Sequence, residues 1–148
     1  MKQTVLTPGK LLDAHGRLAQ AGYATSPVRS YDRGAIRAGR LRIKEWDYYL
    51  VYNESFGVAL TLADNAYMGL VSVSFLDFER GEEHTVSPMF LFPMGRTGLP
   101  AASDRGDVRK AMRGASLSFS HEEGGRRLVA QIDRFPDGQP FACDLLLF

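Results

Sequence analysis

Hydrophobic and polar residues alternate with a period of two through much of the chain after residue 40. The segment 41–52 is rich in aromatic and β-branched residues and contains neither glycine nor proline, which is typical of a strand. Strands are expected at 41–52, 57–63, 67–78, 115–121, 127–133 and 141–147. Short strands separated by turn residues, without a convincing helix, predict an all-β antiparallel meander that forms a sandwich or barrel.

One strand contains a change of phase. In 67–78, Val71, Val73 and Phe75 share one face, whereas Leu76 and Phe78 continue on the other. Such a shift predicts a β-bulge or the corner of a barrel. The region 79–113 reads as irregular, apart from a short buried strand at 89–92.

The first 40 residues lack the regular alternation of the rest of the chain. Five glycines, at positions 9, 16, 22, 34 and 39, interrupt every candidate helix, and each costs about 1 kcal/mol relative to alanine in a helix interior. We therefore expect an irregular segment, 1–40, that packs on a barrel domain, 41–148.

Composition narrows the functional classes. With 148 residues, 18 Lys+Arg and 17 Asp+Glu, the chain has the size of one domain and no overall positive field to attract nucleic acid. Its one cysteine, Cys143, excludes an intrachain disulfide and suits the reducing cytoplasm. No apolar run approaches the roughly 20 residues that span a bilayer, and the first residues lack the apolar core of a secretory signal.

Familiar catalytic motifs are absent from the sequence. There is no phosphate-binding glycine loop, metalloprotease motif, paired-cysteine zinc motif or Gly-x-Ser-x-Gly elbow. His15, His84 and His121 are too scattered for metal-ligand spacing. We expect neither a metal nor another cofactor.

The stretch 44–49 is the most distinctive candidate for chemistry. On a strand, Glu45 and Asp47 share one face, with their carboxylates about 7 Å apart, while Trp46 and Tyr48 share the other. One interpretation places an acid and an aromatic platform in a pocket, at a spacing that acid/base pairs use. The interpretation we favour is simpler: the charged residues face water and the aromatic residues pack inward.

Three segments resemble a known family: LLDAHGRLAQAGYATSP, RGAIRAGRLRIKEWDYYLVYN and GVALTLADNAYMGLVSVSFLDFE. They are similar to the first half of the bacterial domain-of-unknown-function family 2804, over about residues 11–80. The blocks 44–49 and 64–67 are the most specific parts. The resemblance implies a lipocalin-like (calycin) barrel or open half-barrel, distantly similar to two-barrel carotenoid hydratases. It assigns no activity, and a shared fold is weak grounds for one.

Three functions remain open. The first is a module that binds a small apolar or amphipathic molecule, lined by Trp46, Tyr48 and Tyr67. The second is a hydratase or isomerase on an isoprenoid or lipid-like substrate, with Glu45 or Asp47 as general acid. The third is a structural half-barrel whose site requires a second half. If the carboxylates of the strand 41–52 point inward, a catalytic function is favoured. If its aromatic residues point inward, ligand binding or simple core packing is favoured.

The last residues make a separate prediction. Residues 145–148 are Leu-Leu-Leu-Phe, so both faces of a strand there are apolar and its backbone edge invites pairing. We expect the chain to correspond to the N-terminal half of a longer architecture and to self-associate through this strand.

Overall fold

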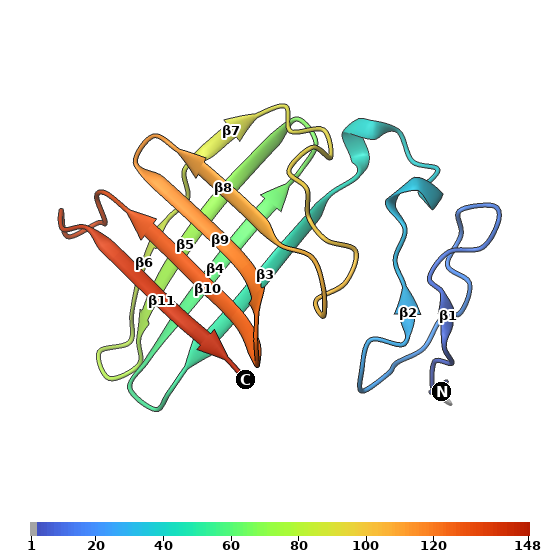
Figure 1. Ribbon diagram of the computed structural model, residues 1–148, viewed down its shortest axis with the longest axis horizontal. Coiled ribbons are helices and arrows are strands. Elements are labelled where there is room, and N and C mark those ends of the chain that lie inside the picture. Colours follow the sequence, from blue (N-terminus) through green and yellow to red (C-terminus); the bar gives the residue numbers. More distant parts are fainter. Residues whose placement is uncertain (1–2) are drawn as a thin grey trace.

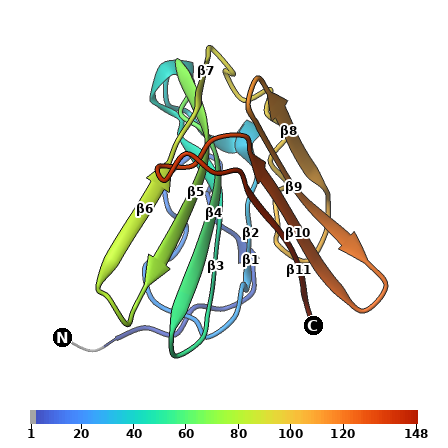
Figure 2. The same cartoon turned by 90° about the vertical axis from the view of Figure 1, so that its left-hand side faces the viewer.

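Two antiparallel sheets face each other in the computed structural model, which describes residues 3–148 (Figures 1 and 2). The first sheet has the order β3 (Glu45–Tyr52), β4 (Phe56–Asp64), β5 (Met68–Asp77) and β6 (Glu82–Val86), and β7 (Met89–Leu91) also pairs with β5. The second has the order β11 (Phe141–Leu147), β10 (Gly125–Ile132), β9 (Ala115–Glu122) and β8 (Val108–Met112). The all-β prediction is confirmed, in the form of an open half-barrel.

The strands β4, β5, β9, β10 and β11 begin and end within two residues of their predicted bounds. The strand β3 starts later than predicted, at Glu45, because Arg40–Arg42 forms the 3₁₀ helix η2. The strands β6 and β8 were missed. Their sequences, EEHTV and VRKAM, carry too little apolar alternation to be recognised, because edge strands leave much of their surface in water.

The predicted bulge in 67–78 is wrong. The strands β4 and β5 pair in one uninterrupted register, from Phe56 opposite Asp77 to Asp64 opposite Gly69. The change of phase instead places a large side chain, Leu76, beside Gly57 on the outer face of the sheet. The predicted buried strand at 89–92 is β7, whose end residues, Met89 and Leu91, are exposed.

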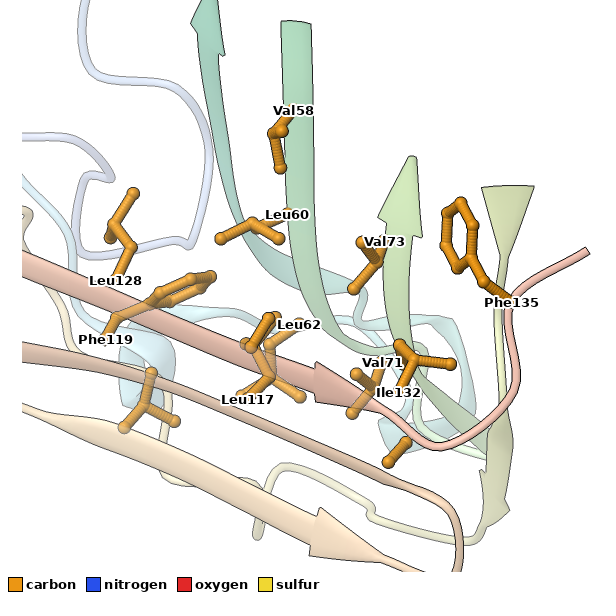
Figure 3. Packing of buried hydrophobic residues seen from close by; sticks show 13 residues of the cluster. Val58, Leu60, Leu62, Val71, Val73, Leu117, Phe119, Leu128, Ile132 and Phe135 are labelled. Carbon is orange, nitrogen blue, oxygen red and sulfur yellow. The ribbon is translucent and has the colours of Figure 1, made fainter. Parts of the chain in front are cut away.

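The core lies between the two sheets, as Figure 3 shows. Alternate residues of the first sheet face alternate residues of the second, so that both inner faces contribute to one apolar layer. The fully buried members include Leu60, Leu62, Val71, Val73, Leu117, Phe119 and Leu128. The ring of Tyr49 meets that of Phe119 edge-on at 4.7 Å, which anchors β3 to the second sheet.

The orientation of β3 is opposite to the one that we favoured. Trp46 and Tyr48 are 61% and 53% exposed on the outer face, whereas Glu45 and Asp47 alternate inward. The register explains this: Tyr49 lies opposite Leu60 and therefore shares the core face with it. On the outer face, the aromatic side chains of β3 and Leu50 lie opposite only small residues of β4, namely Gly57, Ala59, Thr61 and Ala63.

The segment before β3 lies beyond that strand, at one side of the sandwich in Figure 1. It contains the two-residue parallel strands β1 (Gly9–Lys10) and β2 (Arg29–Ser30) and the 3₁₀ helix η1 (Arg33–Ala35). The carboxylate of Asp32 caps η1 by accepting a 2.8 Å hydrogen bond from the backbone N–H of Gly34. None of the helices within residues 3–148 has the length and apolar character needed to cross a membrane.

Candidate functional site

A cleft opens where the N-terminal segment, the start of β3 and the loop after β7 meet. Its volume is about 270 Å³, and it is lined by Tyr31, Lys44, Glu45, Trp46, Asp47, Leu99 and Pro100. Three of the five predicted site residues, Glu45, Trp46 and Asp47, thus come together here. Apolar surface from Leu99 and Pro100 faces two carboxylates, a mixture that is typical of ligand pockets.

The other two predicted residues lie elsewhere. Tyr48 projects from the outer face of the first sheet, and Tyr67 lies in the turn between β4 and β5. Neither side chain lines the cleft.

Glu45 holds the N-terminal segment against the sandwich. Its carboxylate accepts a hydrogen bond from the phenol of Tyr31 and pairs with the guanidinium of Arg33. Burial raises the pKa of Tyr31, against a smaller opposing effect of the Arg33 charge. Because both oxygens of Glu45 are engaged, this residue fixes one wall of the cleft and has no free oxygen for a ligand.

Asp47 is less constrained. Its Oδ2 atom is buried, and no group in residues 3–148 forms a hydrogen bond with it. Loss of contact with water raises the pKa of Asp47, while the positive charge of Arg126 partly opposes that effect. A carboxyl group with a raised pKa and an unpaired oxygen is suited to bind a hydrogen-bond donor or to give up a proton.

Arg126, at the start of β10, faces the core side of the same region. Its side chain is only 8% exposed. Nε donates to the hydroxyl of Tyr49 at 3.1 Å, and Nη1 donates to the carbonyl of Gly106 at 2.7 Å and contacts Nδ1 of His121 at 2.6 Å. Nη2 is buried without a partner in the described part of the chain.

Asp64 holds the loop that closes the cleft. This carboxylate is completely buried. One of its oxygens accepts hydrogen bonds from the backbone N–H of Ala66 (3.0 Å), and the other from the N–H of Gly95 (2.8 Å) and the hydroxyl of Thr97 (2.9 Å). The loop that carries Leu99 is therefore tied to the end of β4.

Sequence reasoning missed both Asp64 and Arg126, although a signal was present. Asp64 continues the inward phase of Leu60 and Leu62, and Arg126 stands in phase with Leu128. A charged residue at an inward-facing position of a strand is rarely buried unless it has partners. Among the described residues, no three His, Cys, Asp or Glu side chains are grouped to hold a metal ion.

Comparison with known proteins identifies a family. The model of the family described as "domain of unknown function (DUF2804)" matches residues 2–148, so the match continues well past residue 80, where the resemblance in the sequence had faded. No curated protein sequence matches the chain.

Proposed function

We propose that this chain, which belongs to the DUF2804 family, is a module that binds a small amphipathic molecule in the cleft beside Asp47. One observation carries the proposal: an apolar wall, Leu99 and Pro100, faces a half-buried carboxylate with an unpaired oxygen. The volume of about 270 Å³ lies just below the usual range of about 300–1,000 Å³ for ligand pockets. The ligand is therefore small.

Cyclohexanol is a suitable probe, because it joins a compact apolar ring to one hydroxyl. Trp46 is the only tryptophan and lines the cleft, so its fluorescence reports binding. We expect a saturable change in emission with one site per chain. A change that fails to saturate, or no change at millimolar probe, would overturn the proposal.

A matched pair of leucine variants locates the site. Leu99→Ser removes apolar surface from the cleft, whereas Leu50→Ser removes a leucine from the outer face of β3. Loss of one buried leucine contact corresponds to about tenfold or more in affinity. Leu99→Ser should weaken cyclohexanol binding by that factor and Leu50→Ser should leave it unchanged; the reverse result would place the ligand on the outer face.

A second candidate function is acid catalysis on an apolar substrate, of the hydratase or isomerase type. The inward orientation of Asp47 and its raised pKa favour it, since a general acid works best with a pKa close to the working pH. In hydration of an alkene, the carboxyl proton is transferred to one alkene carbon. Water adds to the other carbon and returns a proton to the carboxylate.

Limonene tests this second candidate, because hydration converts it to α-terpineol, which gas chromatography separates. We expect product with the wild-type protein and none with Asp47→Asn, which keeps the shape and removes the acid. Product formation at the rate of the buffer blank, or equal rates in both proteins, would exclude Asp47 as a catalytic acid.

We also propose that copies of the chain associate through β11. Among residues 3–148, the strand pairs only with β10, along residues 141–147, so its other edge presents unpaired backbone groups. Leu146 is exposed on its outer face.

The single cysteine, Cys143, is half-buried and remains the basis for proposing a reducing, cytoplasmic location.

A further inference from the structure

A second cavity lies at the opposite end of the sandwich from the cleft. Its volume is about 420 Å³, within the usual range of about 300–1,000 Å³ for ligand pockets. The strand register fixes its position, because Asp77, which lines it, lies opposite both Phe56 and Glu82. Glu45, which lines the cleft, lies opposite Asp64 at the other end of the same sheet. The two sites are therefore separate.

Three phenylalanine rings line this cavity, and they come from both sheets. Phe75 belongs to β5, Phe141 begins β11, and Phe135 lies in the connection between β10 and β11. The rings of Phe135 and Phe141 stack with their centroids 5.0 Å apart. Phe75 stacks on Phe56 at 5.7 Å. Figure 3 shows Phe135 beside Val73 at the edge of the buried cluster, so packing holds the aromatic walls in place.

The turn that carries Phe135 is held by hydrogen bonds of its own. The backbone N–H of Phe135 donates to the carbonyl of Gln139 at 2.7 Å, and the N–H of Gly138 donates to the carbonyl of Phe135 at 2.8 Å. Oδ1 of Asp137 accepts a 2.9 Å hydrogen bond from the N–H of Gln139. Within residues 3–148, Asp137 forms no ion pair, so no cationic side chain neutralises its carboxylate.

Negative charge predominates beside the rings. The cavity is lined by three carboxylates and one guanidinium: Asp77, Glu82, Asp137 and Arg80. Arg80 is 74% exposed and its Nε lies 3.8 Å from Asp77, an exposed pair whose attraction water weakens. Glu82 lies 3.6 Å from the imidazole of His84. A cationic ligand is attracted to such a site and an anionic one is repelled.

The aromatic walls and the carboxylates favour the same kind of ligand. The face of an aromatic ring is negative, and it attracts a cation that lies within about 6 Å of the ring centroid. A quaternary ammonium group has no N–H to hydrogen-bond, so it enters an apolar cavity without leaving a donor unpaired. Its methyl groups pack against rings while its charge remains close to carboxylates.

We propose that the cavity lined by Phe75, Phe135 and Phe141 binds a quaternary ammonium group. The rings contact the methyl groups, and the carboxylates of Asp77, Glu82 and Asp137 balance the charge. This second binding site does not depend on a ligand in the cleft beside Asp47.

Three probes of similar size and shape that differ in charge test this selection: choline, its neutral carbon analogue 3,3-dimethylbutan-1-ol, and the anion 3,3-dimethylbutanoate. In isothermal titration calorimetry with the full chain, choline should bind about tenfold more tightly than the alcohol. The anion should not bind. Choline binding that is no tighter than that of the alcohol, or no choline binding at millimolar concentration, would overturn the proposal.

A matched pair of variants in the same connection tests the charge. Asp137→Asn keeps the oxygen that accepts the Gln139 N–H and removes a carboxylate from the cavity. It should weaken choline binding about threefold. Asp133→Asn changes an exposed aspartate that does not line the cavity, and it should bind choline like the wild type. Equal affinities of the two variants for choline would contradict the proposal.

Phe141→Leu tests the rings, because it keeps an apolar side chain and removes an aromatic face. Binding of choline should weaken while binding of 3,3-dimethylbutan-1-ol stays nearly unchanged, since only the cation loses an attraction to the ring. Equal losses for the two probes would mean that the ring only shapes the cavity, and the proposal would be wrong.

Chemical-shift mapping with the wild type locates the site even if Phe141→Leu does not fold. On addition of choline, the backbone amides of Asp77, His84 and residues 137–141 should shift with saturation. Shifts concentrated instead at Tyr31 and residues 44–47 would place the cation in the cleft and overturn the proposed second site.

Discussion

The hydroxyl of Tyr49 on β3 accepts a 3.1 Å hydrogen bond from Nε of Arg126 on β10. The bond crosses the gap between the two sheets, next to the edge-on contact of the Tyr49 ring with Phe119. A single side chain therefore joins the apolar core to the polar end of the sandwich, where the cleft opens.

Tyr49→Phe keeps the ring contact but removes the acceptor of the buried Nε–H. Leaving a buried, charged donor unpaired costs about 1–3 kcal/mol, and we expect the free energy of unfolding to fall by that amount in urea denaturation. The matched control is Tyr48→Phe, whose hydroxyl is on the exposed outer face. Tyr48→Phe should change the free energy of unfolding by no more than about 0.5 kcal/mol. Equal effects of the two substitutions would show that the bond between the sheets contributes nothing.

Asp47 gives stability an identifiable pH dependence. Its pKa is raised in the folded state, chiefly by desolvation, so the folded chain binds more protons than the unfolded chain above about pH 4. The contribution of Asp47 to stability is therefore lost as pH rises from there through its folded pKa. Asp47→Asn removes this loss and should stabilise the protein at neutral pH by on the order of 0.5 kcal/mol, discounted because the group is half exposed.

The comparison of wild type and Asp47→Asn is made by urea denaturation at neutral pH and again at about pH 3, well below the usual aspartate pKa of about 3.9, where Asp47 is largely protonated in both states. The difference should vanish at the lower pH. A difference that does not change with pH, or a variant less stable at neutral pH, would show that attraction to Arg126 outweighs desolvation.

The carboxylate of Asp64 should control the loop that bears Leu99. In Asp64→Asn, an amide N–H₂ replaces one of the two acceptor oxygens. The hydrogen-bond donors at that oxygen, either the Ala66 N–H or the Gly95 N–H and Thr97 hydroxyl, then lose their acceptor. We expect a loss of about 2–3 kcal/mol in unfolding free energy and faster hydrogen exchange at the Gly95 amide. Asp77→Asn is the control, because Asp77 accepts two backbone hydrogen bonds in an exposed turn. Normal exchange at Gly95 in Asp64→Asn would contradict this role.

The strands with strong alternation were predictable, and the reason is visible in β4 and β9. Leu60, Leu62, Leu117 and Phe119 recur every second residue and are buried together. The strand β6 was not predictable in this way, because its five residues are mostly polar and it is defined by backbone pairing with β5. Hydrogen bonding between strands leaves no trace in the side-chain pattern of such an edge.

The site was only half predictable for a different reason. Alternation shows that Glu45 and Asp47 share a face, but the register with β4 decides that this face is the inner one. The sequence of β3 is apolar on both faces, with Tyr49 and Val51 on one and Trp46 and Tyr48 on the other. Its own pattern therefore does not choose between them. Arg126 joins Asp47 only through the packing of two sheets that are distant in sequence.

If copies of the chain associate through β11, a positive charge placed on that strand should prevent the association. Leu146→Lys places a positive charge beside the unpaired edge, a substitution by which natural proteins block edge-to-edge pairing. In sedimentation velocity at high micromolar concentration, we expect the wild type to associate and Leu146→Lys to sediment as a monomer. Leu50→Lys changes an equally exposed leucine of the other sheet and should associate like the wild type. A monomeric wild type would contradict the proposal.

Chemical-shift mapping of the backbone amides during titration with cyclohexanol shows whether a ligand binds in the cleft beside Asp47. We expect saturable shifts concentrated at Tyr31, the Lys44–Asp47 segment and Leu99, which line the cleft. Shifts confined instead to the outer face of β3, around Leu50 and Tyr52, or no saturable shift at any residue, would contradict binding in the cleft.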